Sequence, residues 1–315
     1  MPTILITGGT GMIGKALSDL LLSKGYELII LSRNNPVKHN LNTPNIRYAS
    51  WDIKKQKIDA WAIAEADGII HLSGANIAEK RWTSRRKKEI LESRTNSADL
   101  LVNALQTIPN KVKILISASA IGWYKPLLPA EGNSVRVETD PPDPGFLGRT
   151  CRQWEQHVQQ AEKTGIRIVI LRTGIVLNRE GGAFPSFRRP IRAGIAAVLG
   201  SGKQVISWIH IEDLCRIYLS AIQDESFNGV YNAVAPMPVT NKEFTRALAK
   251  AIKGQFYLTV HVPSFILKLL LGEMSIEVLK SARVSSEKLK KTGFQFMFPG
   301  INSAVEDLTA KGVGG

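Results

Sequence analysis

A glycine-rich turn near the start of the chain has the residue types and spacing that bind phosphate groups. Residues Thr7 to Gly14 read Thr-Gly-Gly-Thr-Gly-Met-Ile-Gly. Gly8 permits a tight turn, Gly11 lets the backbone approach a pyrophosphate, and Gly14 allows a helix to pack closely on a strand. The first N–H groups of a helix that starts here would face those phosphates. The pattern therefore predicts a dinucleotide site.

The segments around this turn supply the elements that such a site needs. An apolar run at 4–6 precedes the turn, and apolar residues at helical spacing follow it as far as Leu21. Gly25 is a natural helix terminator, and a second apolar run follows at 28–31. A strand, a glycine turn, a helix and a strand in this order are the context that a dinucleotide fingerprint requires.

The end of the second expected strand favours NADP over NAD. Many NAD-binding units carry an acidic residue here, which binds the ribose 2′-hydroxyl. This chain instead has Ser32 and Arg33. An arginine can hold a 2′-phosphate through forked, charge-assisted hydrogen bonds, and a serine hydroxyl can add a donor. The alternative is that Arg33 is a solvated surface residue.

Further apolar runs, at 68–72, 112–116 and 166–171, alternate with segments of helical spacing at 84–107 and 149–164. This alternation predicts an α/β protein with a Rossmann-type, doubly wound parallel sheet. Ligands of such sheets bind at the carboxyl ends of the strands. The cofactor-binding residues expected there are Gly8, Thr10, Gly11, Met12, Ile13, Gly14, Ser32, Arg33, Leu72, Ser73, Gly74, Ala75 and Ser117.

The chain is expected to divide into a cofactor domain and a smaller C-terminal α+β lobe that holds the substrate. The NADP-binding Rossmann domain takes 1–175, and 205–232 return to it. The lobe takes 176–204 and 233–315. Within the lobe, Thr240 is expected to cap a helix in a capping box with Glu243 three residues on.

Composition narrows the functional classes. Hydrophobic residues make up 44% and charged residues 22%, which is ordinary for a soluble globular protein. No apolar stretch approaches the ~20 residues of a membrane span, and Met1 leads directly into the first strand, so we expect a cytoplasmic protein without a signal peptide or membrane contact. It is expected to be a monomer or a homodimer, with no bound metal.

The net charge of +14 raises the question of nucleic acid. The basic clusters, at 80–94, 188–192 and 288–291, lack the regular aromatic residues of a single-strand platform and belong to no recognisable nucleic-acid module. They are expected to be solvated faces, or to attract an anionic substrate or cofactor. A small-molecule substrate is therefore the expected partner, and nucleic acid is not.

By its motifs the chain resembles the extended short-chain dehydrogenase/reductase superfamily, in its nucleotide-sugar-epimerase-like branch. The resemblance rests on Thr7 to Gly14, His71 to Ala75, Ser93 to Asn96, Ile116 to Ala120 and Trp208 to Asp213. Residues 251–315 resemble the C-terminal extension of the subgroup of epimerase family proteins. The resemblance implies a nicotinamide cofactor, a structural asparagine at Asn96 and a catalytic serine at Ser119.

One departure from the superfamily limits what it implies about activity. Its members use a Tyr-x-x-x-Lys pair, in which the tyrosine is the acid/base and the lysine lowers its pKa and holds the nicotinamide ribose. A glutamate often follows four residues after the lysine. If Glu155 is that glutamate, the lysine position is Cys151 and the tyrosine position is Leu147. No tyrosine in the chain has a lysine four residues on.

Three functions remain open. The first is an NADP(H)-dependent oxidoreductase or epimerase-like enzyme that acts on a small anionic metabolite, with Ser119 binding substrate and Tyr124 as proton donor. There Cys151 could carry a proton or act as nucleophile if its thiol faces the pocket; otherwise Tyr124 and Cys151 are packing residues. The second is a catalytically silent NADP(H)-binding sensor or scaffold. The third is a nucleic-acid-binding protein, which steep salt dependence would reveal.

Three polar residues after later strands have structural and functional interpretations. His210 and Asp213 lie three residues apart, a spacing that fits a catalytic pair or a structural tie between the lobe and the sheet. Arg172 follows a buried strand and is expected to pair with a carboxylate or with backbone carbonyls, although a substrate contact is also open.

Overall fold

An eight-stranded sheet forms the centre of the computed structural model, which describes residues 1–33, 44–128, 131–132 and 134–310. Every neighbouring pair of strands is parallel except the pair formed by β3 and β4 at one edge. In spatial order the strands are β12 (Gly229–Ala233), β7 (Arg167–Thr173), β6 (Ile114–Ala120), β5 (Gly68–His71), β1 (Thr3–Thr7), β2 (Glu27–Ser32), β3 (Ile46–Asp52) and β4 (Lys57–Ile58).

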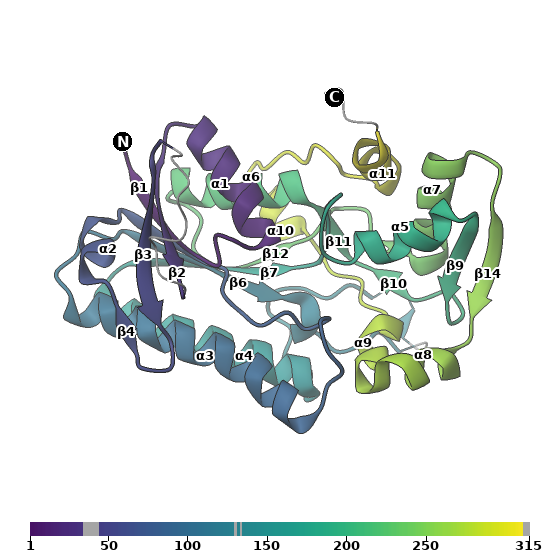
Figure 1. Ribbon diagram of the computed structural model, residues 1–315, viewed down its shortest axis with the longest axis horizontal. Coiled ribbons are helices and arrows are strands. Elements are labelled where there is room, and N and C mark those ends of the chain that lie inside the picture. Colours follow the sequence, from purple (N-terminus) through teal and green to yellow (C-terminus); the bar gives the residue numbers. More distant parts are fainter. Residues whose placement is uncertain (34–43, 129–130, 133, 311–315) are drawn as a thin grey trace.

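Helices cover both faces of this sheet (Figure 1). One face carries α1 (Met12–Ser23) and α6 (Ile211–Gln223), and the opposite face carries α2 (Ala60–Glu65), α3 (Ser84–Thr107) and α4 (Phe146–Gln159). Strand side chains alternate between two buried clusters, so that Ile4 and Ile6 face α1 while Leu5 faces α3. The predicted Rossmann-type, doubly wound parallel sheet is confirmed.

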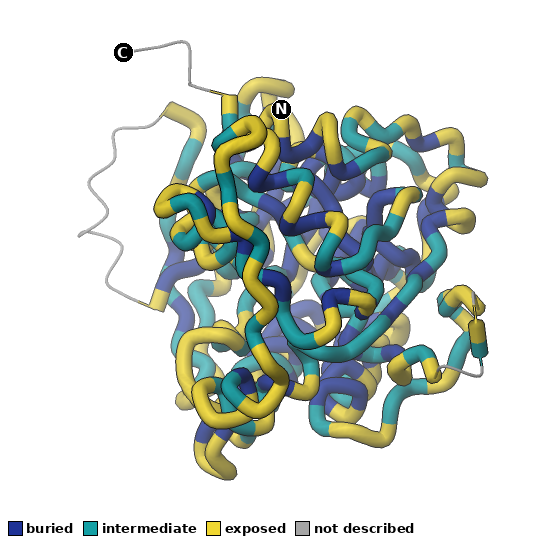
Figure 2. The backbone as a smooth tube through the Cα atoms, turned by 90° about the vertical axis from the view of Figure 1, so that its right-hand side faces the viewer, coloured by how far each residue is buried: buried dark blue, intermediate teal, exposed yellow. Residues whose placement is uncertain are grey.

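The smaller lobe consists of short strand pairs and helices at the right of Figure 1. β8 (Ile175–Leu177) pairs with β11 (Trp208–His210), β9 (Ile195–Leu199) with β14 (Leu258–Val262), and β10 (Val205–Ile206) with β13 (Val239–Thr240). Its helices are α5 (Phe184–Arg192), α7 (Asn241–Lys253), α8 (Ser264–Leu271), α9 (Ser275–Leu279) and α11 (Ile301–Thr309). Seen from this side, buried segments gather inside and exposed ones outside (Figure 2).

Local signals mark the helix that begins at Asn241. The Thr240 side chain accepts from the Glu243 N–H, and the Glu243 carboxylate accepts from the Thr240 N–H at 2.7 Å. Both halves of the predicted capping box are therefore present. Phe244 and Leu248 are buried on the inner face of α7, as their spacing predicts.

The C-terminal segment does not stay in the lobe. After α9 the chain crosses back, and α10 (Glu287–Lys290) brings Leu289 into the cluster that lies between α1 and the sheet. Phe294 joins the same cluster. Residues near 290 thus belong to the core of the cofactor domain, although we expected the whole of 233–315 in the lobe.

Among the helices of the described segments, none has the length and apolar character that a membrane crossing requires.

Candidate functional site

The glycine turn lies at the carboxyl end of β1, in the middle of the sheet. Gly11 N–H donates to the carbonyl of Gly8 at 3.0 Å, and Gly8 has φ of +70°, which favours glycine. A Cβ on Gly14 would lie 2.5 Å from Gly9 Cα, and closer still to the Gly8 carbonyl. The turn can therefore form only because Gly14 has no side chain.

The first turn of α1 is open for an anion. Gly11 is its N-cap, and among the described residues no side chain caps the helix or places an acidic group in its first turn. Thr10 and Gly11 are exposed, whereas Met12 and Ile13 are half-buried. A Cβ on Gly181 would lie 2.8 Å from the Met12 sulfur, so the loop after β8 covers this side of the turn. A helix N-terminus of this kind stabilises a bound phosphate.

Two further strand ends lie beside the turn. Arg33 follows β2 and is exposed, and Ser32 is the buried last residue of that strand. Residues 34–43, which follow Arg33, lie outside the described residues. On the other side β5 ends at His71, and the segment 72–75 continues from it along the same edge of the sheet.

A chain of hydroxyl groups fixes the two loops to each other. Thr7 Oγ1 accepts from the N–H groups of Leu72 at 3.1 Å and Ser73 at 3.2 Å, so its own proton points to His71 Nδ1 at 2.8 Å. His71 Nε2 therefore carries the ring proton and faces Ser97 Oγ at 3.3 Å. Burial lowers the pKa of His71 to about 3, and nearby Arg94 adds to this shift. His71 is therefore a neutral residue that connects Thr7, at the start of the glycine turn, to Ser97 on α3.

The resemblance implied a structural asparagine at Asn96, and the structure corrects this assignment. Asn96 lies on the exposed side of α3, whereas Ser97 is fully buried and reaches His71. Ser117 is also buried, and its hydroxyl donates to the carbonyl of Ala118 at 3.0 Å within β6. The two serines are thus held by neighbouring protein atoms.

Ser119 belongs to a buried cluster at the carboxyl end of β6. Its hydroxyl donates to Glu155 Oε1 at 2.6 Å. Arg172 donates to both oxygens of the same carboxylate, at 2.9 Å from Nε and 2.8 Å from Nη2. Arg172 also donates to the Glu138 carbonyl, so the expected pairing with a carboxylate and a carbonyl is confirmed. The carboxylate holds the Ser119 proton, which leaves the oxygen of this hydroxyl able to accept a hydrogen bond.

Tyr124 is part of the same network but has no access to solvent. Its hydroxyl donates to Asn232 Oδ1 at 2.6 Å and accepts from Arg172 at 3.1 Å. Its ring packs with Val234, and with Ala282 and other residues of the C-terminal segment. Burial raises the pKa of Tyr124 to about 12, although Arg172 opposes the shift. This environment suits a residue that orients Arg172 and joins the lobe to the sheet.

Helix α4 carries the positions at which the resemblance led us to expect the acid/base pair. Leu147, Cys151 and Glu155 follow one another at single-turn spacing and are all buried. The Cys151 thiol donates to the Ala120 carbonyl at 3.6 Å, and burial raises its pKa to about 11. A neutral thiol that faces a carbonyl is not an activated nucleophile.

His210 and Asp213 have structural partners. The Asp213 carboxylate is fully buried and accepts from the N–H groups of Met297 at 2.8 Å and Phe298 at 2.9 Å. His210 Nδ1 accepts from the Glu212 N–H and so caps α6. The pair ties the C-terminal segment to the cofactor domain, which is the structural interpretation of its spacing.

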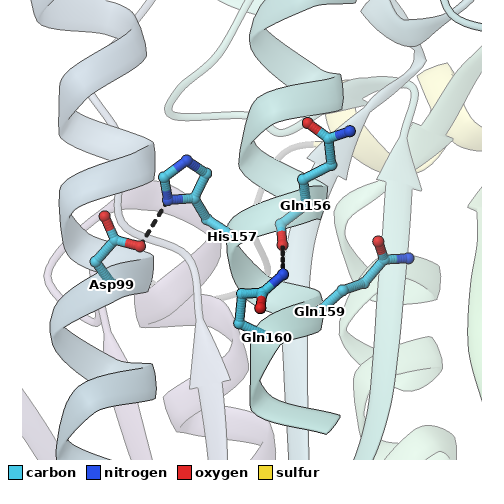
Figure 3. A pocket seen from close by; sticks show the side chains of 5 residues that line it. All are labelled: Asp99, Gln156, His157, Gln159 and Gln160. Atoms are coloured by element: carbon cyan, nitrogen blue, oxygen red, sulfur yellow. Dashed lines mark hydrogen bonds and ion pairs between the residues drawn. The ribbon is translucent and has the colours of Figure 1, made fainter. Parts of the chain in front are cut away.

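A hollow on the surface lies away from this site, between α3 and the end of α4 (Figure 3). His157 Nδ1 lies 2.6 Å from Asp99 Oδ1, and this pair joins the two helices. The other lining residues are Gln156, Gln159 and Gln160. They lie five to nine residues beyond Cys151 along the chain. We therefore place the site at the glycine turn and not at this hollow.

Sequence reasoning placed His71 and Glu155 in motifs but did not predict the bonds that they make. Each is buried and bonded to a residue far along the chain. The available signal was the presence of a polar residue within an apolar strand or on the apolar face of a helix. Such a residue indicates a hydrogen-bond partner, because buried polar groups require partners. The identity of the partner could not be deduced from spacing.

Comparisons with known proteins agree with this architecture. The chain is 37% identical to an epimerase family protein of Staphylococcus saprophyticus, over 98% of this chain and 99% of the relative. It is also 37% identical to an epimerase family protein of Staphylococcus aureus, over 99% and 100% of the two chains.

Among solved structures, the human epimerase family protein SDR39U1 (isoform 2) with NADPH superimposes with a TM-score of 0.85. It is 29% identical, and the match covers 98% of this chain and 99% of that one. UDP-glucuronic acid 4-epimerase from Bacillus cereus, at 18% identity and a TM-score of 0.78 over 98% of both chains, shares the fold.

Two family models match the chain in succession. Residues 262–308 match a domain of unknown function, DUF1731. Residues 4–233 match the NAD dependent epimerase/dehydratase family, and they include the glycine turn, the Ser119 cluster and the strand order described above. The chain therefore belongs to the NAD dependent epimerase/dehydratase family and carries that second domain at its C-terminal end.

Proposed function

We propose that this protein binds NADP(H) at the carboxyl edge of its sheet and carries out redox or epimerase-like chemistry on a small anionic metabolite. The glycine turn carries this proposal, because Gly14 admits no side chain and the first turn of α1 is uncapped. The human relative was solved with NADPH. Arg33, exposed at the end of β2, is the residue we assign to the 2′-phosphate.

The residues at the site divide into binding and positioning roles. The cofactor, when bound, supplies hydride exchange at its nicotinamide ring. The N–H groups of Met12 and Ile13 would hold its phosphates, and the 72–75 segment would line its other half. Ser119, whose proton is held by Glu155, offers its oxygen to a substrate hydroxyl. Tyr124 orients Arg172 in this scheme, since both partners of its hydroxyl are protein groups.

A second candidate function is a catalytically silent NADP(H)-binding sensor or scaffold. The observation that favours it is the character of Leu147 and Cys151, which provide neither an acid/base nor a cation. The two functions differ in turnover alone. Incubating the NADPH-loaded protein with anionic ketones and the NADP⁺-loaded protein with nucleotide sugars separates them, because only an enzyme oxidises NADPH with a ketone or converts a sugar to its epimer while the nucleotide is regenerated.

Calorimetric titration with NADPH, NADP⁺, NADH and NAD⁺ tests the binding proposal. We expect the 2′-phosphorylated forms to bind more tightly, since Arg33 adds a charge-assisted hydrogen bond worth about tenfold in affinity. Arg33→Asp should reverse this preference, whereas Arg152→Asp, at an exposed position on α4, should not. An unchanged preference in Arg33→Asp would mean that another residue contacts the 2′-phosphate. Failure of all four nucleotides to bind would overturn the proposal.

A further inference from the structure

Position 151 of α4 holds a cysteine in place of the expected lysine, and an arginine from another helix lies near it. Arg94 extends from α3 across the loop after β5. Its Nη1 donates to the Ile90 carbonyl at 2.8 Å and to the Ala75 carbonyl at 3.2 Å. Its guanidinium carbon lies 5.2 Å from the ring centre of Trp154, which is three residues beyond Cys151 on α4. The cation therefore lies between the β5 loop and the helix that lacks the lysine.

The loop is shaped to let this side chain pass. A Cβ on Gly74 would lie 3.0 Å from Arg94 Cζ, 3.2 Å from Nη2 and 3.3 Å from Nε. The plane of the guanidinium thus rests on an exposed glycine of the segment that we expected to line the cofactor. A larger residue at position 74 would push the guanidinium away from the edge of the sheet.

Arg94 is not paired as a purely structural arginine would be. Arg86, two turns earlier on α3, has ion pairs with Glu79 at 3.0 Å and Glu89 at 2.8 Å. Within the described part of the chain Arg94 has no carboxylate partner, and Nε and Nη2 make no hydrogen bond. Burial lowers the pKa of Arg94, whereas Glu89 raises that of Arg86 against the effect of burial. Withdrawing a cation from water without a partner is costly, so an anionic or polar ligand is its natural complement.

The order of the strands indicates which part of a dinucleotide Arg94 would meet. The pyrophosphate turn lies at the end of β1, and Arg33 lies at the end of β2 on one side. The loop under Arg94 follows β5, on the other side of β1. A dinucleotide bound across β1 has its adenosine half on the β2 side and its nicotinamide half on the β5 side.

We propose that Arg94 supplies, from α3, the positive charge that Cys151 cannot supply from α4, and that its Nε and Nη2 donate to oxygen atoms of the nicotinamide-ribose half of NADP(H). This inference rests on the proposed function. Two donors in a fixed fork match a pair of neighbouring hydroxyl oxygens. The loss of the lysine is then compensated within the same edge of the sheet, and the cofactor remains anchored at both ends.

The test compares a complete cofactor with a fragment of it. Affinity for NADPH and for adenosine 2′,5′-bisphosphate, which lacks the nicotinamide riboside and the phosphate attached to it, is measured calorimetrically on the full chain. Arg94→Met should weaken NADPH by about tenfold or more and leave the fragment unchanged, because hydrogen bonds to charged groups are lost only with NADPH. Arg94→Lys should recover part of the loss. Arg85→Met removes the same charge from an exposed position of α3 and should change neither affinity.

Gly74→Ala provides a second variant if Arg94→Met does not fold. Its Cβ would make the guanidinium move by a few tenths of an ångström while the charge remains, so a smaller but still selective loss of NADPH affinity is expected. Equal NADPH affinity in the wild type and both variants would overturn the inference and leave the proposed function intact. An equal loss for NADPH and the fragment would also overturn it. A wild-type protein that binds the fragment and NADPH equally, or neither, would remove the nicotinamide contact altogether.

Discussion

At the level of single residues, Arg172 and Glu155 form a buried ion pair. Their side chains are 3% and 4% exposed, and two parallel hydrogen bonds join them. Glu155 also holds Ser119, so the pair fixes the residue to which we assign substrate contact. The guanidinium stacks 3.6 Å from the ring centre of Trp123. The two hydrogen bonds and the stacking on Trp123 thus offset the free-energy cost of burying both charges. Removal of one partner would leave the other charge buried and unpaired.

Arg172→Met should therefore lower the free energy of unfolding by about 3–5 kcal/mol, because it leaves the Glu155 carboxylate buried and unpaired. The exposed pair of Arg47 and Glu65 is the control, with side chains 45% and 49% exposed. Arg47→Met should cost less than about 1 kcal/mol. Urea unfolding measures both values. Similar costs for the two variants would contradict the role assigned to the buried pair.

His71 should make stability depend on pH. Its pKa is about 3 in the folded protein and near 6.5 in the unfolded chain. Below pH 6.5 the unfolded chain takes up a proton that the folded protein does not, so the free energy of unfolding falls as pH drops toward 3. The slope from this group is about 1.4 kcal/mol per pH unit.

Urea unfolding at pH 7, 6 and 5 can isolate this contribution by comparing the wild type with His71→Asn, which cannot titrate. Between pH 7 and 5 the wild type should lose about 2 kcal/mol more than the variant. The variant itself should be less stable at pH 7, since it disturbs the contacts with Thr7 and Ser97. Parallel pH profiles would show that His71 does not stay neutral in the folded state.

At the level of elements, the start of α1 joins fold and function. The helix can approach β1 because Gly14 presents only hydrogen to the backbone of Gly8 and Gly9. The same close approach leaves the N–H groups of the first turn free. Close packing and the phosphate binding that we propose would thus both result from one backbone arrangement.

Gly14→Ala should disrupt both properties together. Its Cβ would overlap backbone atoms that cannot move aside, which costs about 1–3 kcal/mol in unfolding free energy, and the displaced helix should lose NADPH affinity. Asp19→Ala, at an exposed position of the same helix, should preserve both. Calorimetric titration and urea unfolding give the two measurements. An NADPH affinity unchanged in Gly14→Ala would mean that the turn does not hold the phosphates.

Elements with strong local signals were predictable from the sequence. The helix at Ser84–Thr107 has its expected bounds, and Thr240 forms its capping box. The strand Ile46–Asp52 was missed, because its buried residues alternate with polar ones at an edge of the sheet and no apolar run marks them. In the site, the glycine turn is a local signal. The Glu155 and Arg94 contacts are not, because each depends on which strands and helices become neighbours.

For the whole molecule, the position of the sheet edge explains why four separate segments meet at one site. Parallel strands all present their carboxyl ends on the same side, so the turns after β1, β2, β5 and β6 converge although they are far apart in the sequence. Basic residues contribute to a net charge of +14, which raises the local concentration of an anionic cofactor or substrate. The lobe then supplies the covering side, through the loop that contacts Met12.

The hydrogen bonds of Asp213 affect the stability of the two segments that match family models, residues 4–233 and 262–308. Its buried carboxylate accepts from Met297 and Phe298, while Leu289 and Phe294 fill the core under α1. Cutting the chain between 233 and 262 would remove Leu289 and Phe294 from the hydrophobic core of the first segment. We therefore expect the two segments to unfold together in one cooperative transition. Cofactor bound at the glycine turn would then stabilise the distant C-terminal segment by mass action, without touching it.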